Sequence, residues 1–396
     1  MNCFCGIADM RGASLDFARL LRMRGGILQR GAARTEAYIE RSVGLLCACE
    51  LDSGSLNTSL PHLHPIPGGT LALALDGEVI IPREPLEEKP QSAAAPNELA
   101  ERFLTFGCET PLEIDGEFSF AAIDSVRREL FLAVDTECSH PIFFHKDKNR
   151  LVFSNSIRPL LSYSPQAAEV DKAAIIELLC APAGEVSSED IYKNISPLNS
   201  GHFMVFSGLG ASVCEYASRK STLSTKESTP DGKKVISLTK DRTANIVSAA
   251  EEILFCFDYP EFDEYSPEYL SAVRHLKEHL HTTCRISVEE LSADVSESFA
   301  KLKADRIGAA FGIRLSPILQ KKKTPHARAF LSEREKKLSL CVKAILSSPQ
   351  SHIKRIFGSS LDAILSRECD TASKVRTLGK IIGLERWLES YPIIPT

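Results

Sequence analysis

Three pairs of cysteine or histidine residues in this chain stand two positions apart, a spacing that could serve thiol chemistry or a metal ion. The pairs are Cys3 with Cys5, Cys47 with Cys49, and His62 with His64. Zinc-binding cysteines usually have two or more residues between them. Side chains two positions apart point to one face of a strand, so buried structural thiols are the simpler interpretation of the cysteine pairs. We therefore predict no metal site.

A polar stretch that follows the apolar residues 235–238 is the second candidate for chemistry. It holds the hydroxyl groups of Thr239 and Thr243 and the cationic groups of Lys240 and Arg242. These groups could hold an anion such as phosphate at the end of a strand. The alternative is a solvated turn, and the lack of glycine in the stretch favours it.

The elements around these residues predict an α+β first domain dominated by strands. Predicted strands cover residues 71–75, 118–123, 130–134 and 151–154. The first of these runs into Asp76-Gly77, which indicates a turn, while the second and third flank a polar segment, which indicates a hairpin. Helical spacing covers residues 97–106 and 172–179.

The second half differs in pattern from the first. Residues 217–233 are rich in serine and threonine and indicate a linker or a surface loop. Helical periodicity then follows over residues 266–280, 287–311 and 374–391. We therefore predict two domains, residues 1–222 and residues 223–396.

Composition and charge exclude several classes of protein. The chain has 396 residues, of which 43% are hydrophobic and 25% charged, as in a soluble globular protein of two or three domains. A net charge of −5 offers no basic surface for nucleic acid. We find no signal peptide and no apolar run long enough to span a membrane. Twelve scattered cysteines favour reduced thiols, so we expect an intracellular and most simply a cytoplasmic protein.

A series of short motifs follows a fixed order along the first half. The motifs are Cys5-Gly6-Ile7-Ala8, Gln29-Arg30-Gly31, His64-Pro65-Ile66, Asp76-Gly77-Glu78-Val79, Asp115-Gly116-Glu117-Phe118, Leu130-Phe131-Leu132-Ala133-Val134-Asp135, His140-Pro141-Ile142-Phe143-Phe144, Phe153-Ser154-Asn155-Ser156 and Leu198-Asn199-Ser200-Gly201-His202. Their order resembles that of the class II glutamine amidotransferase domain in the asparagine synthetase family. Residues 260–264, 305–319 and 384–388 resemble segments of the same family's synthetase domain.

This resemblance implies both a fold and a reaction. The implied fold is an αββα sandwich of the N-terminal-nucleophile hydrolase type, followed by a shortened α/β domain of the PP-loop synthetase type. Members of the family hydrolyse glutamine in the first domain and activate a carboxylate with ATP and Mg²⁺ in the second.

Cys5 corresponds to the family's nucleophile, which must be the first residue because its own α-amino group is the base for its thiol. Four residues precede Cys5 here, so an amide stands where an amine is needed. Residues 1–4 could be removed to expose a working nucleophile, or Cys3 or Cys5 could act as an ordinary thiol. The third interpretation, a packed strand residue in an inherited fold, is favoured by the loss of other glutamine-binding groups.

Those losses concern the oxyanion hole and the substrate clamp. Asp76 and Gly77 correspond to the asparagine and glycine whose donors meet the developing negative charge, and a carboxylate at position 76 repels that charge unless it is protonated. The family's paired arginines correspond to Leu46 and Cys47, and its substrate-binding aspartate falls in residues 95–98. Each lost charge-assisted contact is worth roughly 1.5–3 kcal/mol.

The resemblance and its departures lead to one leading hypothesis and one alternative. The leading hypothesis is a catalytically degenerate asparagine synthetase homologue that serves as a structural or regulatory subunit, with a protein partner or a second copy. The alternative is an ATP-dependent amide-forming ligase with an altered substrate. ATP and Mg²⁺ are implied by the family, but the pyrophosphate loop corresponds to residues 238–245, which lack its glycines, so we assign no cofactor. The candidate site residues are Cys5, Asp76 and Gly77 for catalysis and Thr239, Lys240, Arg242 and Thr243 for cofactor binding.

Overall fold

The computed structural model divides the chain into two compact units. It describes residues 3–10, 12, 14–28, 34–49, 61–82, 94–136, 138, 140–147, 149–181, 191–217, 235–237, 249, 262, 270, 283–289, 307, 314–320, 327–367, 369–391 and 393–395. Unit 1 joins Met1–Ala167 to Asn194–Lys226, and unit 2 joins Ala168–Lys193 to Glu227–Thr396. The division that we predict at residue 222 stays a prediction.

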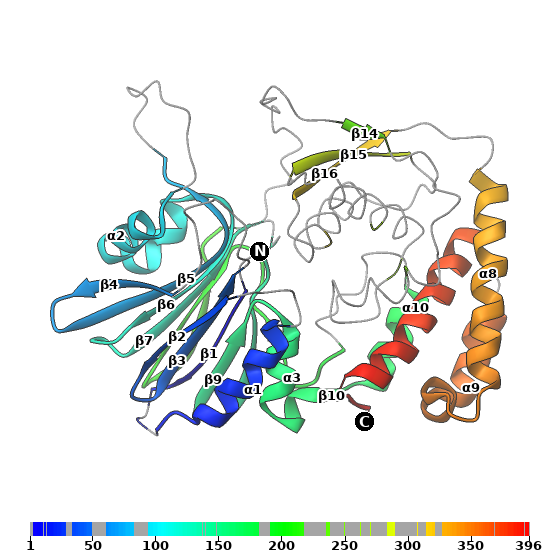
Figure 1. The fold of residues 1–396 in the computed structure, drawn as a ribbon, viewed down its shortest axis with the longest axis horizontal. Coiled ribbons are helices and arrows are strands. Elements are labelled where there is room, and N and C mark those ends of the chain that lie inside the picture. The colour runs from blue at the N-terminus through cyan, green and yellow to red at the C-terminus, as the bar shows by residue number, and fades with distance from the viewer. Residues whose placement is uncertain are drawn as a thin grey trace. The chain divides into compact units, whose positions relative to one another are not determined.

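Unit 1 contains two six-stranded antiparallel sheets (Figure 1). The first sheet has the order β11-β8-β9-β1-β3-β2, with β1 (Cys3–Asp9), β2 (Arg34–Glu40), β3 (Val43–Cys49), β8 (Phe143–Asp147), β9 (Arg150–Ser154) and β11 (Ser196–Pro197). The second has the order β13-β12-β7-β6-β5-β4, with β4 (His62–Ile66), β5 (Gly69–Ile80), β6 (Asp115–Asp124), β7 (Glu129–Val134), β12 (His202–Ser207) and β13 (Gly210–Glu215). The predicted strands and the predicted hairpin between β6 and β7 are confirmed.

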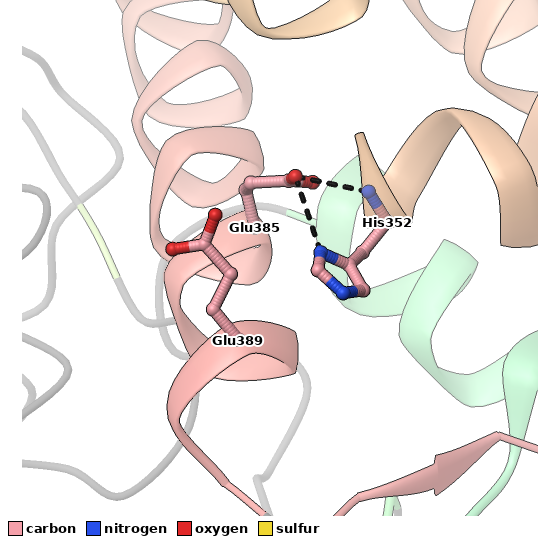
Figure 2. Close-up of side chains that lie close together, drawn as sticks. All are labelled: His352, Glu385 and Glu389. Atoms are coloured by element: carbon pink, nitrogen blue, oxygen red, sulfur yellow. Dashed lines mark hydrogen bonds and ion pairs between the residues drawn. The ribbon is translucent and has the colours of Figure 1, made fainter. Parts of the chain in front are cut away.

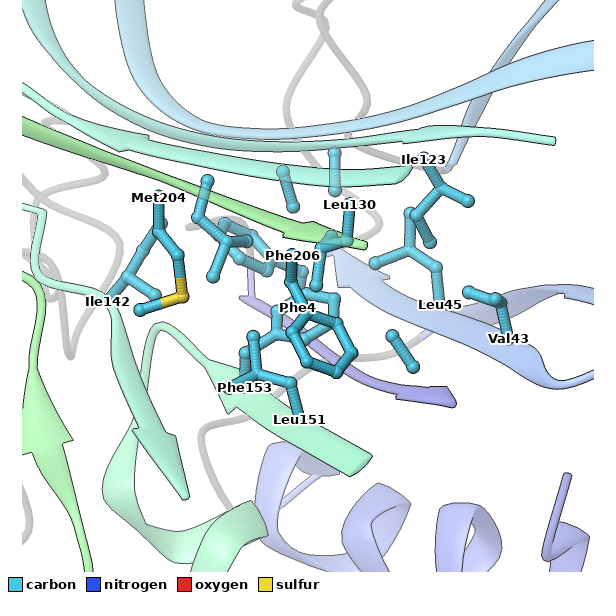
Figure 3. Close-up of a cluster of buried hydrophobic side chains, with 14 of the residues drawn as sticks. Phe4, Val43, Leu45, Ile123, Leu130, Ile142, Leu151, Phe153, Met204 and Phe206 are labelled. Atoms are coloured by element: carbon cyan, nitrogen blue, oxygen red, sulfur yellow. The ribbon is translucent and has the colours of Figure 1, made fainter. Parts of the chain in front are cut away.

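The main core of unit 1 lies between the two sheets (Figure 3). The first sheet contributes Phe4, Ala8, Leu45, Cys47, Leu151 and Phe153. The second sheet contributes Ala72, Ala74, Ala121, Ile123, Leu130, Leu132, Val134, Met204 and Phe206. Because side chains alternate along a strand, the residues between these positions face the outer side of each sheet.

Helices cover the outer faces and complete four layers. Helices α1 (Phe17–Leu28) and α3 (Ile157–Tyr163) contact strands of the first sheet. Helix α2 (Pro96–Phe106), followed by the 3₁₀ helix η1 (Gly107–Leu112), packs Leu99 and Ala100 on the outer face of the second sheet. The predicted helix–sheet–sheet–helix layering is therefore present in unit 1, and α2 confirms the helix predicted over residues 97–106.

Strand β5 differs from the prediction at Asp76-Gly77. We expected a turn there, but β5 continues to Ile80 and stays paired with β6. Gly77 has a φ of +91° and its partner strand carries Gly116 at +119°. A Cβ on either glycine would lie 2.1–2.2 Å from a carbonyl oxygen of the opposite strand. The two glycines thus let the backbones approach closely where a turn was predicted, because only glycine adopts these φ values without strain.

Unit 2 contains a parallel sheet and a group of helices. The short 3₁₀ helix η2 (Pro165–Ala168) ends the first segment of unit 1 and reaches the first residue of unit 2. The elements of unit 2 are β10 (Glu169–Val170), α4 (Lys172–Cys180), β14 (Val235–Ser237), β15 (Thr283–Glu289), β16 (Arg314–Gln320), α8 (Ala327–Ser347), α9 (His352–Ser366), α10 (Thr371–Ser390) and β17 (Ile394–Pro395). Strands β14, β15 and β16 pair in parallel, and β10 pairs in parallel with β17. No helix in the described ranges is long and apolar enough to cross a membrane.

Several predictions for this part of the chain are confirmed and one is wrong. Helices α4 and α10 confirm the helices predicted over 172–179 and 374–391. The helix predicted over residues 287–311 is wrong at its start, where β15 runs to Glu289. Ile307 is helical, as predicted, and the other residues of 290–311 lie outside the described residues. Trp387 of α10 is fully buried and meets Tyr192 edge to face, with ring centroids 5.8 Å apart, so it is a core residue.

Candidate functional site

Asp76 lies at the centre of a buried polar cluster in unit 1. It continues the face of β5 that carries Ala72 and Ala74, and that face looks into the space between the two sheets. The carboxylate is 4% exposed, so it must find partners inside the protein. Its side-chain partners Asn155 and His140 come from segments far from it in the sequence.

Asn155 connects Asp76 to the first sheet. Its Nδ2 donates to Asp76 Oδ2 at 2.8 Å, and its Oδ1 accepts from the backbone N–H of Phe4 at 3.0 Å. The backbone N–H of Asn155 also donates to the carbonyl of Phe4 at 3.2 Å. Because Asn155 directly follows β9 and Phe4 lies in β1, this side chain joins the two sheets through Asp76.

His140 supplies the opposite charge. Its Nδ1 lies 3.1 Å from Asp76 Oδ2. The segment that presents it is held by Asp135, whose carboxylate accepts from the backbone N–H groups of Phe118 at 2.8 Å and Cys138 at 2.7 Å. Asp135 is itself buried, so it anchors this segment and is not the surface residue that its position after a strand suggests.

The pair is electrostatically coupled. Burial disfavours both charged forms, but the neighbouring Asp76 carboxylate overcomes this for His140 and raises the pKa of His140 from 6.5 to about 9. For Asp76, burial alone would raise the pKa, yet the charge of His140 and hydrogen bonds from His140 and Asn155 hold that pKa below its usual value. At neutral pH the cluster therefore contains a carboxylate and an imidazolium that neutralise one another.

Gly77 is covered by the same histidine. A Cβ at Gly77 would lie 2.8 Å from Cδ2 of His140 and 2.1 Å from the carbonyl oxygen of Glu117. The imidazole thus packs against the glycine whose counterpart in the family donates to an oxyanion. An oxyanion hole needs donors aimed at an open position, whereas here the neighbours of Gly77 are a carboxylate, an imidazole ring and a carbonyl group.

Cys5 lies in the middle of β1 and points away from this cluster. Its backbone pairs with Leu46 on one side and Ser154 on the other, and Cys3 and Phe4 precede it in the strand. Phe4 faces the inter-sheet core, so Cys5 faces the opposite side of the sheet, toward the helix layer. Its side chain is fully buried, and burial together with Cys3 raises the pKa of the Cys5 thiol far above its usual value. Such a thiol is not ionised at neutral pH.

The structure brings together only part of the predicted site. Asp76 and Gly77 are adjacent in one cluster, while Cys5 lies on the other face of β1. Leu46 and Cys47, at the positions of the family's paired arginines, are buried. The four predicted cofactor-binding residues, Thr239, Lys240, Arg242 and Thr243, lie outside the described residues, so their role stays a prediction.

His140 and Asn155 belong to the cluster although we did not predict them as site residues. Both stand in motifs that carry the resemblance, His140-Pro141 and Ser154-Asn155, but neither motif indicates a polar partner for residue 76. The useful signal was the carboxylate at position 76. A buried carboxylate requires a cation or several donors, so a nearby histidine and amide were the residues to seek.

Chemically, the cluster can hold a proton and connect the two sheets, but it presents no thiolate beside an oxyanion donor. Among the described residues, the one group of three potential metal ligands contains none of the paired cysteines and histidines. The absence of a metal site at those pairs stays a prediction. His64 instead lies 3.0 Å from Asn97 through its Nδ1, at the exposed start of α2.

Comparison with known proteins places this geometry in a family. Residues 4–217 match the family model described as a glutamine amidotransferase domain. A segment of 103 residues is 27% identical to asparagine synthetase [glutamine-hydrolyzing] 3 from Bacillus subtilis, covering 26% of this chain and 17% of that protein. The chain therefore spans less than a fifth of that relative.

Solved structures give weaker similarities. One is glutamine phosphoribosylpyrophosphate amidotransferase from B. subtilis complexed with ADP and GMP, at 11% identity and a TM-score of 0.38, covering 80% of this chain and 65% of that one. Another is described as the allosteric regulatory enzyme of purine biosynthesis, with the same identity and TM-score, covering 82% of this chain and 67% of that one. The family model covers more than half of the chain. The chain belongs to the glutamine amidotransferase domain family.

Proposed function

We propose that this protein is an asparagine synthetase-like homologue that has lost glutamine hydrolysis and acts as a structural or regulatory subunit of a larger assembly. The observation that carries the proposal is the separation of Cys5 from the Asp76–Gly77 cluster by the first sheet. A glutaminase needs its nucleophile and its oxyanion donors around one substrate carbon, within about 3 Å of the reacting atoms.

The electrostatics of the cluster support the same conclusion. A thiol that is fully buried and has a raised pKa supplies no thiolate. A carboxylate paired with His140 replaces the neutral donor that stabilises an oxyanion. Both features serve packing: Cys5 is buried on the helix side of the first sheet, and the Asp76–His140 pair is buried between the two sheets.

Glutamine turnover by the purified full chain tests this proposal. We expect no glutamate above the level of a Cys5→Ala variant. Mass spectrometry of the protein isolated from its source gives the mature N-terminus in parallel. Turnover that disappears in Cys5→Ala would refute the proposal, and a mature chain that begins at Cys5 would point to the same conclusion.

One observation favours a second candidate, an ATP-dependent amide-forming ligase with an altered substrate. Unit 2 contains three parallel strands, β14, β15 and β16. In α/β proteins ligands bind at the carboxyl ends of such strands, and Thr239 to Thr243 follow the carboxyl end of β14. Under this second candidate function, the second domain is a reduced domain of the PP-loop type that binds ATP with Mg²⁺.

Calorimetry with ATP and Mg²⁺ separates the two candidates. Under the leading proposal we expect no heat of binding in the wild type. Saturable binding that is lost in both Lys240→Ala and Arg242→Ala would favour the ligase instead. The twelve cysteines agree with a cytoplasmic location under both proposals, because a reducing compartment keeps such thiols free.

A further inference from the structure

The start of α9 and the last turns of α10 bring a histidine and two glutamates together in unit 2 (Figure 2). One ring nitrogen of His352 and one carboxylate oxygen each from Glu385 and Glu389 lie within 4.8 Å of one another. Glu385 and Glu389 stand four residues apart, so they lie one turn apart on the same face of α10. His352 faces Glu385 from the first residue of α9.

Glu385 is already held in place by α9. Its carboxylate accepts from the backbone N–H groups of His352 at 2.9 Å and Ile353 at 3.0 Å, and Ser351 Oγ lies 3.5 Å away. These donors belong to the amino end of the helix, which attracts negative charge. A carboxylate has about four lone pairs on two oxygens, so Glu385 keeps acceptor capacity after these contacts.

His352 provides the observation that points to a ligand. Its Nδ1 is buried and has no hydrogen-bond partner in the described part of the chain. Oε1 of Glu385 lies 3.5 Å from this nitrogen, which is beyond a good hydrogen bond. Two ligands bound to one tetrahedral zinc ion at ~2.05 Å lie about 3.3 Å apart. The observed distance therefore suits two ligands of one metal better than a donor and its acceptor.

Glu389 supplies the third ligand and the remaining charge. It is 37% exposed and pairs with the neighbouring Arg386 at 2.8 Å. Surface ion pairs of this kind are worth about 1 kcal/mol or less, so the side chain can turn toward Glu385 at little cost. Two carboxylates and a neutral imidazole carry the charge of −2 that balances a divalent cation.

We propose that His352, Glu385 and Glu389 form a binding site for a divalent transition-metal ion such as Zn²⁺, with water completing the coordination. One imidazole nitrogen and two carboxylate oxygens are zinc ligands, whereas calcium and magnesium select oxygen ligands alone. The ion would join α9 to α10 at their contact. We did not predict this site from the sequence, because the two glutamates stand 33 and 37 positions after His352 in the chain.

Zinc titration of the EDTA-treated full chain tests the proposal. We compare the wild type with His352→Ala and Glu389→Gln, which leave the Glu385 contacts with α9 in place. Asp362→Asn is the matched control, because it removes one exposed negative charge from α9 away from the cluster. We expect one zinc ion per chain, at least ten-fold weaker binding in both site variants, and unchanged binding in the control.

Two further measurements identify the ligands. Bound zinc should raise the melting temperature of the wild type and Asp362→Asn, but not of the site variants, and Ca²⁺ should have no such effect. Cobalt(II) bound here should give visible bands without the near-ultraviolet absorption of a cobalt–thiolate bond. Equal zinc affinity in all four proteins, an equal response to Ca²⁺, or a thiolate band in the cobalt complex would overturn the proposal.

Discussion

The ion pair between Asp76 and His140 should make the stability of unit 1 depend on pH, and His140→Gln should remove that dependence. Glutamine keeps a neutral donor near the carboxylate but cannot carry a charge. The pKa of His140 is raised from 6.5 to about 9 in the folded protein. A raised pKa contributes stability that is fully present below 6.5 and is lost as the pH rises through about 9.

The size of the effect follows from that shift. Each pKa unit corresponds to 1.36 kcal/mol, so the rise from 6.5 to about 9 is worth about 3 kcal/mol. This agrees with the 3–5 kcal/mol typical of removing one partner from a buried pair. We therefore expect His140→Gln to lower the unfolding free energy of unit 1 by about 3 kcal/mol at pH 6. The difference should fall below about 1 kcal/mol at pH 9.

The assay must report on unit 1, and the lone tryptophan, Trp387, lies in unit 2. Urea unfolding followed by pulsed hydrogen exchange of peptides from β5 and β6 reads the correct unit. Measurements at pH 6, 7, 8 and 9 cover the window in which His140 titrates. Asp76 titrates below this window because its pKa is lowered, so it does not contribute to the slope.

A double-mutant cycle completes the experiment. Asp76→Asn restores a neutral side chain, keeps a polar partner for Asn155 and removes the charge that holds the proton on His140. His140→Gln should therefore have little pH-dependent effect in the Asp76→Asn background. If the wild type and His140→Gln differ by the same amount at pH 6 and pH 9, the pair does not titrate as described and the reasoning is wrong.

Three further predictions concern packing and reactivity. In urea unfolding, Gly77→Ala should destabilise unit 1 by about 2–3 kcal/mol more than Gly210→Ala. Both glycines have a positive φ, but of the two only Gly77 has atoms within 4 Å of a new Cβ, so an equal loss of stability would contradict this prediction. In native protein, iodoacetamide should modify the exposed Cys108 within minutes and Cys5 only after unfolding, as read by peptide mass spectrometry; equal rates would mean that Cys5 is accessible. Lys380→Met should destabilise unit 2 by about 2 kcal/mol, because the buried Lys380 side chain donates to two carbonyl groups at the end of α4. Urea unfolding followed by tryptophan fluorescence measures this, and a change below about 0.5 kcal/mol would show that these hydrogen bonds contribute little.

Local pattern was a good guide to the strands and to several helices. Runs such as residues 118–123 and 130–134 form strands because alternate apolar side chains can be buried on both faces of a sheet between layers. The turn predicted at Asp76-Gly77 failed because local propensity assigns aspartate and glycine to turns. It cannot register that β6 carries a second glycine, Gly116, opposite Val79, and that the two glycines permit close pairing of the strands.

The sequence by itself determined the family, most of the strands and the replacement of a neutral donor by a carboxylate at position 76. These are properties of residue type and order along the chain. Only the tertiary structure decided that His140 and Asn155 complete the cluster and that Cys5 faces the other side of β1. It also decided that His352 meets Glu385. The physical reason is that each outcome depends on which faces of distant segments pack together, and burial makes any uncompensated charge there too costly to leave alone.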